Sequence, residues 1–102
     1  MSGHSKDVLI VNKRGLHARA SAKFVAVAAV MEGTVITVAK DGNCALGGSI
    51  LGLMMLGAAK GDIVTLSAEG EAAEARLALL VELIETGLLL SVAITGLWIH
   101  TT

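Results

Sequence analysis

Residues 12–19 bring a nucleophile, a fixed cation and a glycine close together in the chain. Gly15 can release the backbone from the end of a strand, and His17 follows where an amphipathic helix is predicted to begin. Histidine titrates near neutral pH, and its neutral ring nitrogen can act as a nucleophile. Arg19 adds a permanent positive charge, and the first N–H groups of a helix have no partner inside it. Together these groups are suited to holding a phosphoryl group on His17.

The composition predicts one small domain with an aliphatic core. The chain has 102 residues, of which 54% are hydrophobic, and Phe24 and Trp98 are its only aromatic residues. Its net charge of −1, from eight basic and nine acidic residues, does not favour nucleic-acid binding. The single Cys44 can form neither an internal disulfide nor a paired-cysteine metal site. We therefore expect no metal and a reducing, cytoplasmic setting.

The composition of the two ends argues against a targeting or membrane-spanning segment. Residues 1–6 lack the apolar centre of a signal peptide. Residues 88–99 are apolar, but Ser91, Thr95 and Gly96 interrupt them, and the run is shorter than the roughly 20 residues that cross a bilayer. We expect a domain over residues 1–87 and an apolar tail over residues 88–102, to which no function is assigned.

Hydrophobic patterning and turn residues divide the domain into strands and helices. The predicted strands cover residues 7–11, 34–39, 44–46 and 63–68. The predicted helices cover residues 18–30, 50–56 and 71–85. Asp41 and Gly42 form a typical two-residue hairpin turn. This order predicts an α+β fold, an open-faced β-sandwich with a four-stranded antiparallel sheet covered on one face by three helices.

The same pattern predicts which side chains enter the core. In the first two helices these are Phe24, Val27, Ala28, Leu53 and Leu56. In the last helix, three- and four-residue spacings predict an inward face of Ala72, Ala75, Leu79, Leu80, Leu83 and Ile84. Cys44 is expected to be a small buried strand residue.

Three stretches of the chain resemble the HPr family, the histidine-containing phosphocarriers of the bacterial phosphotransferase system. Residues 12–22, with Gly-Leu-His-Ala-Arg, resemble its active-site segment, and residues 48–57 resemble its regulatory-serine helix. Residues 60–71 resemble its last strand and the start of its last helix. The resemblance covers roughly residues 5–87. One departure is Ala20, where the family usually has proline; alanine is a good helix former, so we expect the helix to persist.

The resemblance implies a phosphoryl carrier rather than a stand-alone enzyme. His17 would accept a phosphoryl group on Nδ1 from phosphorylated Enzyme I and pass it to an enzyme IIA, in the sugar or the nitrogen-related branch of the system. The phosphate would lie over the backbone N–H groups of Ala18 and Arg19, and the Arg19 guanidinium would contact its oxygens. No cofactor or metal is needed, and neither nucleic acid nor a membrane is an expected partner.

Other residues are candidates for regulation and partner binding. Ser49 is expected to be the N-cap of the helix over residues 50–56, and the resemblance adds its phosphorylation by an HPr kinase/phosphorylase. A patch of exposed apolar side chains beside His17 is expected to dock partners: Ile50, Leu51 and Met54. Lys23 is interpreted either as a docking residue or as a solvated surface charge. Lys13 and Arg14 are interpreted as solvated charges that steer acidic partners.

Two other interpretations stay open at this point. A regulatory protein-binding module on the same fold would engage partners without phosphotransfer. The presence of His17 argues against that module, while Ala20 in place of the family proline keeps it open. A ligand-sensing α+β domain is a third interpretation, because this fold class hosts many functions. It leaves both the histidine and the serine motif unexplained.

Overall fold

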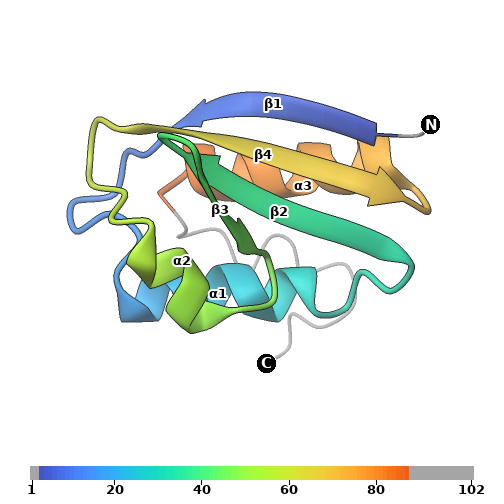
Figure 1. Cartoon of the computed structure of the whole chain (residues 1–102), viewed down its shortest axis with the longest axis horizontal. Coiled ribbons are helices and arrows are strands. Elements are labelled where there is room, and N and C mark those ends of the chain that lie inside the picture. The colour runs from blue at the N-terminus through green and yellow to red at the C-terminus, as the bar shows by residue number, and fades with distance from the viewer. Residues whose placement is uncertain (1–2, 88–102) are drawn as a thin grey trace.

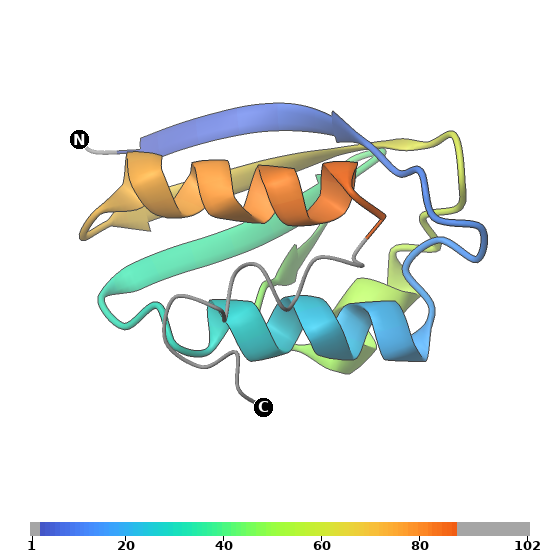
Figure 2. The same ribbon diagram turned by 180° about the vertical axis from the view of Figure 1, so that it is seen from behind.

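Four antiparallel strands form one sheet, and three helices cover one of its faces (Figures 1 and 2). The computed structural model describes residues 3–87. Its elements are β1 (Gly3–Leu9), α1 (Ala18–Ala28), β2 (Thr34–Lys40), β3 (Asn43–Leu46), α2 (Ile50–Met55), β4 (Ile63–Gly70) and α3 (Ala73–Glu85). The strand order is β1-β4-β2-β3. The predicted α+β, open-faced β-sandwich is therefore confirmed.

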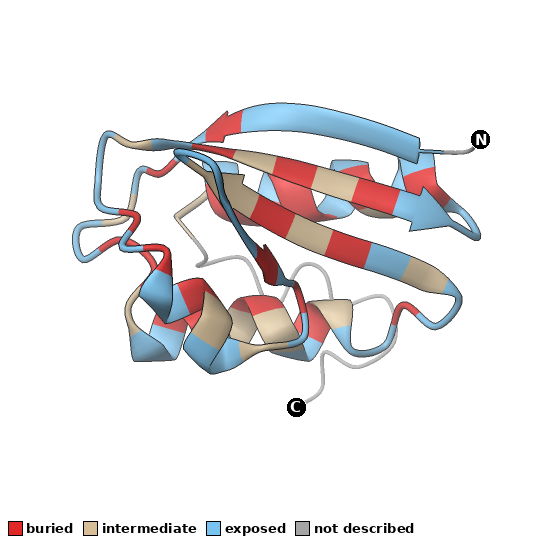
Figure 3. Cartoon of the chain, in the orientation of Figure 1, coloured by how far each residue is buried: buried red, intermediate tan, exposed pale blue. Residues whose placement is uncertain are grey.

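The core lies between the sheet and the helices. In the sheet register Val8 lies opposite Val64, and Val38 lies opposite Leu66. All four of these side chains are buried. Figure 3 shows the alternation of buried and less buried residues along β2 and β4. Because successive strand side chains point to opposite faces, β2 and β4 each contribute one row to the core and leave the other row on the uncovered face, while β1 and β3 each bury a single side chain.

The hairpin between β2 and β3 forms at the predicted turn. Asp41 and Gly42 both have positive φ, 52° and 85°, as a two-residue hairpin turn requires. The prediction that Cys44 is buried was wrong, because Cys44 is exposed. β3 is an edge strand in which the neighbouring Ala45 takes the buried position, so Cys44 lies on the opposite face.

The first strand and the first helix differ from the predicted bounds. β1 begins at Gly3 and ends at Leu9 instead of covering residues 7–11. Its first residues are exposed and carry no apolar pattern, yet they pair with β4 from Gly3 opposite Glu69 onward. Pairing with β4, rather than local hydrophobicity, sets the start of this strand. α1 ends at Ala28 rather than at residue 30, and its Phe24 and Val27 are buried as predicted.

The inward face of α3 was only partly predicted. The helix begins at Ala73, because Ala72 has a left-handed backbone with φ 51°. Three predicted core residues are buried, namely Leu80, Leu83 and Ile84. The other three are exposed, namely Ala72, Ala75 and Leu79, and their places are taken by Ala73, Leu77 and Val81. A helix that is apolar around most of its circumference does not reveal by spacing alone which stripe faces the sheet.

The predicted apolar tail over residues 88–102 lies outside the described residues. Over residues 3–87, the helices are all too short or too polar to cross a bilayer. The same residues contain no cluster of three or more histidine, cysteine or acidic side chains that could hold a metal ion.

Candidate functional site

His17 is the N-cap residue of α1. Its backbone is extended, with φ −74° and ψ −176°, and its carbonyl oxygen accepts the N–H of Ser21 at 2.9 Å. The imidazole turns back over the helix start, where Nδ1 accepts the backbone N–H of Arg19 at 3.3 Å. A ring nitrogen that accepts a hydrogen bond carries its lone pair there, so Nε2 carries the proton of the neutral ring. The contact is longer than a typical N–H hydrogen bond, so Nδ1 is only weakly engaged.

The first turn of α1 surrounds this nitrogen with positive potential. Its first N–H groups, those of Ala18, Arg19 and Ala20, have no acceptor inside the helix. The helix dipole adds partial positive charge at the same end. The helix persists with Ala20, which is buried, at the position of the family proline. Nδ1 therefore faces the part of the helix that best accommodates an anion.

A hollow of about 580 Å³ opens in front of His17. It is lined by Asn12, Lys13, Arg14, His17, Ala18, Arg19, Ala20, Lys23 and Gly87. Four of these residues are lysine or arginine, and none of these described lining residues is acidic. The predicted site residues His17, Ala18, Arg19 and Lys23 thus lie together in one cationic hollow. Lys13 and Arg14, interpreted from the sequence as solvated steering charges, lie in the wall of the same hollow.

A close backbone approach holds the turn that precedes His17. Gly15 has φ +64°, and a Cβ added there would lie 2.1 Å from the carbonyl oxygen of Ala58. The N–H of Leu16 donates to that same oxygen at 2.9 Å. On the other side, the carbonyl of Leu16 accepts the buried hydroxyl of Ser21 at 3.1 Å. Both polar groups of Leu16 are therefore bound immediately before the histidine.

Three residues that support the site were not predicted from the sequence, namely Asn12, Ser21 and Ala58. Asn12 lines the hollow, and its Nδ2 donates to the carbonyl of Gly15 within the turn. Ser21 lies in the first turn of α1, and its burial could not be read from the sequence. Ala58 is distant in sequence, and the residues alone give no sign that it touches the turn.

Ser49 and the apolar side chains of α2 lie outside the His17 hollow. Ser49 is the N-cap residue of α2 as predicted, and its Oγ accepts the N–H of Gly52 at 2.9 Å. The predicted patch is exposed at Ile50 (40%), Leu51 (65%) and Met54 (39%), and Met55 (77%) extends it. Leu53 and Leu56 are buried, as predicted. α2 lies beside α1 in the helical layer, so the patch adjoins the helix whose start carries His17 (Figure 1).

A comparison with protein families identifies the chain. The family model described as the PTS HPr component phosphorylation site matches residues 4–86. The chain belongs to the HPr family. It is 46% identical over 78 residues to the phosphocarrier protein HPr of Pseudomonas aeruginosa, covering 76% of this chain and 87% of that protein. The fold agrees with a crystal structure of HPr from Bacillus anthracis, with a TM-score of 0.78, 33% identity and coverage of 82% and 99% of the two chains.

One further match is short and of a different kind. It covers 22 residues, or 22% of this chain, which are 96% identical to 9% of an adenosylcobinamide-GDP ribazoletransferase from Novosphingobium aromaticivorans. Because the match covers so small a share of that protein, its activity is not inferred for this chain. The HPr match over residues 4–86, by contrast, includes every helix and strand of the described fold except Gly3, the first residue of β1.

Proposed function

We propose that this HPr chain carries a phosphoryl group on Nδ1 of His17, accepted from Enzyme I and passed to an enzyme IIA. The position of Nδ1 beside the first N–H groups of α1, in a hollow lined by four cations, supports this proposal most strongly. The Nδ1 lone pair attacks phosphorus as the bond between phosphorus and the donor's leaving atom breaks. Nε2 keeps its proton, and the helix N–H groups and Arg19 face the oxygens of the transferring group.

A carrier has to release the group as readily as it accepts it. Stabilisation limited to the transition state serves this need better than tight binding of the phosphorylated product. His17 is half-buried and Arg19 is exposed, so solvent screens the charges around the phosphoryl group. The open hollow also lets two different partners reach the same nitrogen in turn.

The proposal is tested with phosphoenolpyruvate, Enzyme I and an enzyme IIA from the same organism. Incubation of the chain with phosphoenolpyruvate and Enzyme I is expected to add one phosphate-sized mass increment, labile in acid, in intact-mass spectrometry. Addition of the enzyme IIA is then expected to remove it. A chain that binds Enzyme I without gaining mass would instead fit a regulatory protein-binding module.

Replacing Arg19 with alanine is expected to slow phosphoryl acceptance about 10- to 100-fold, the cost of losing a charged hydrogen bond to the transferring group. Arg19→Lys keeps the charge but loses the planar fork and is expected to fall between wild type and Arg19→Ala. The rate is measured by rapid quench with phosphorylated Enzyme I. Lys6→Ala removes an exposed cation of β1, outside the hollow, and is the matched control. Equal rates for Arg19→Ala and Lys6→Ala would contradict the role of Arg19.

We also propose that Ser49 is a regulatory phosphorylation site and that the exposed side chains of α2 receive the partner. The Oγ of Ser49 caps α2 next to Ile50, Leu51 and Met54. A phosphate on it would therefore place negative charge at the edge of the docking surface. An acidic partner surface would then be repelled without refolding of the helix, since the start of a helix tolerates an anion.

Two substitutions at Ser49 separate capping from charge. Ser49→Asp keeps a good N-cap and adds charge, so we expect an unchanged free energy of unfolding and a several-fold slower transfer at low salt. Ser49→Ala loses the bond to Gly52, so we expect a loss of about 1 kcal/mol in urea unfolding and an unchanged transfer rate. If Ser49→Asp transfers as fast as wild type at low salt, charge at this position does not regulate docking.

A further inference from the structure

The segment that leads into His17 lies along the loop of residues 58–62, which precedes β4. Both ends of this segment are held by backbone hydrogen bonds of 2.8–2.9 Å, which join Ile10 to Gly61 and Asp62, and Leu16 to Ala58. The side chains of Leu16 and Ala58 are also both buried in the core. The position of the peptide immediately before His17 therefore depends on the position of this loop.

Asp62 closes the loop with a reciprocal pair of hydrogen bonds to Ala59. Its carboxylate Oδ2 accepts the N–H of Ala59 at 2.8 Å, and its own N–H donates to the carbonyl oxygen of Ala59 at 2.9 Å. Ala59 directly follows Ala58, whose carbonyl oxygen binds the N–H of Leu16. The N–H of Ala59 and the carbonyl of Ala58 belong to the same peptide group, so loss of the carboxylate would free one end of the peptide that holds Leu16.

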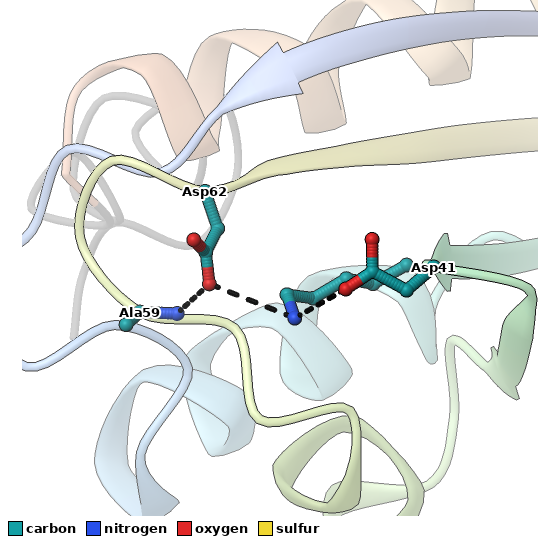
Figure 4. Close-up of polar contacts among 4 residues, drawn as sticks. Asp41, Ala59 and Asp62 are labelled. Carbon is teal, nitrogen blue, oxygen red and sulfur yellow. Dashed lines mark hydrogen bonds and ion pairs between the residues drawn. The ribbon is translucent and has the colours of Figure 1, made fainter.

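Lys40 at the end of β2 anchors this carboxylate to the sheet (Figure 4). Its Nζ lies 2.9 Å from Oδ2 of Asp41 and 3.7 Å from Oδ2 of Asp62. The hydrogen bond to Asp41, with the charges of Asp41 and Asp62, raises the pKa of Lys40. The Lys40 side chain is 17% exposed, so it is held between the hairpin and the loop rather than extended into solvent. The cation thus keeps the Asp62 carboxylate between Ala59 and the sheet.

We propose that Asp62 is a positioning residue for phosphoryl transfer at His17, a role that rests on the carrier function proposed above. Asp62 is not among the residues that line the hollow, so it acts through the backbone. It holds Ala59, and the adjacent Ala58 carbonyl holds the peptide of Leu16. In-line attack demands accurate placement, and a displacement of about 1 Å can cost about a hundredfold in rate.

Two variants of Asp62 test this role through the rate of phosphoryl acceptance and the NMR signals of Leu16 and His17, and through the rescue of both by a conservative substitution. Asp62→Ala is expected to slow phosphoryl acceptance from Enzyme I about tenfold, as a partial displacement of Nδ1 would. It is also expected to shift the NMR signals of the Leu16 amide and the His17 ring nitrogens in the ¹⁵N-labelled chain. Asp62→Asn keeps an oxygen acceptor for the N–H of Ala59, so it is expected to restore both the rate and the signals to near wild type.

Asp41→Asn is the matched control. It removes the carboxylate nearer to Lys40, but Asp41 has no bond to the loop, so the rate and the signals of Leu16 and His17 are expected to stay at wild-type values. Unshifted signals and a wild-type rate in Asp62→Ala would overturn the proposal. So would an Asp41→Asn chain that is as slow as Asp62→Ala.

The experiment separates this inference from the carrier function itself. If the wild-type chain accepts no phosphate, the carrier function fails, while the NMR signals of Leu16 and His17 still report whether Asp62 positions them. If Asp62→Ala does not fold, Lys40→Gln takes its place, because it removes the cation that helps to keep the Asp62 carboxylate on the N–H of Ala59. Lys40→Gln is expected to shift the same signals by a smaller amount, and unshifted signals would overturn the proposal.

Discussion

Replacing Gly15 with alanine is expected to lower the free energy of unfolding by about 3 kcal/mol or more. The new Cβ would lie 2.1 Å from the carbonyl oxygen of Ala58 and 2.8 Å from Cα of Ala59, and both contacts are with backbone that cannot rotate away. The left-handed φ of +64° adds a cost of its own for any residue with a side chain. Urea unfolding followed by circular dichroism measures the loss.

Gly42→Ala is the matched control for this substitution. Gly42 has φ +85° at the tip of the β2–β3 hairpin, and an added Cβ there would meet no atom within 4 Å. Gly42→Ala therefore has only the cost of a left-handed φ in a residue with a side chain, which is expected to lower the free energy of unfolding by about 1 kcal/mol. Equal losses at Gly15 and Gly42 would show that the close approach to Ala58 does not hold the turn before His17.

Replacing His17 with alanine is expected to abolish phosphoryl acceptance, because the reaction then lacks its nucleophile. His17 is the one histidine among the described residues that lines the cationic hollow, and its Nδ1 faces the helix N–H groups. The fold is expected to remain, since half-buried His17 contributes little to the core. Intact-mass spectrometry after incubation with phosphoenolpyruvate and Enzyme I is expected to show no phosphate-sized gain.

His4→Ala is the control for this loss. His4 lies on the exposed edge strand β1 and lines a different hollow, against α3. It is expected to leave the mass gain and the rate at wild-type values. A mass gain that persists in His17→Ala and disappears in His4→Ala would move the phosphoryl site to β1 and refute the proposed carrier mechanism.

The elements with strong local signals were predictable from the sequence. β2 was predicted from its β-branched residues, the hairpin from Asp41 and Gly42, and the start of α2 from Ser49. β1 and the face of α3 were not, for two different physical reasons. The polar start of β1 is held by its ladder with β4, and the apolar residues of α3 lie on several sides of the helix.

Part of the candidate site was likewise predictable from the sequence, and part of it was not. His17, Ala18 and Arg19 are neighbours in sequence, and a helix start after a glycine turn brings them to one point by local geometry alone. The grouping of Gly87 with His17 in one hollow, and the contact of Leu16 with Ala58, depend on how distant segments pack. No pattern within a single stretch of residues carries that information, so the support of the site appeared only in the fold.

The proposed transfer through His17 is tested most directly by the NMR spectrum of its imidazole nitrogens before and after phosphorylation by Enzyme I. The geometry predicts that the neutral ring carries its proton on Nε2 and that the phosphoryl group appears on Nδ1 of His17. A phosphoryl group on Nε2, on another residue, or on no residue under conditions in which Enzyme I is itself phosphorylated would contradict phosphoryl transfer through Nδ1 of His17.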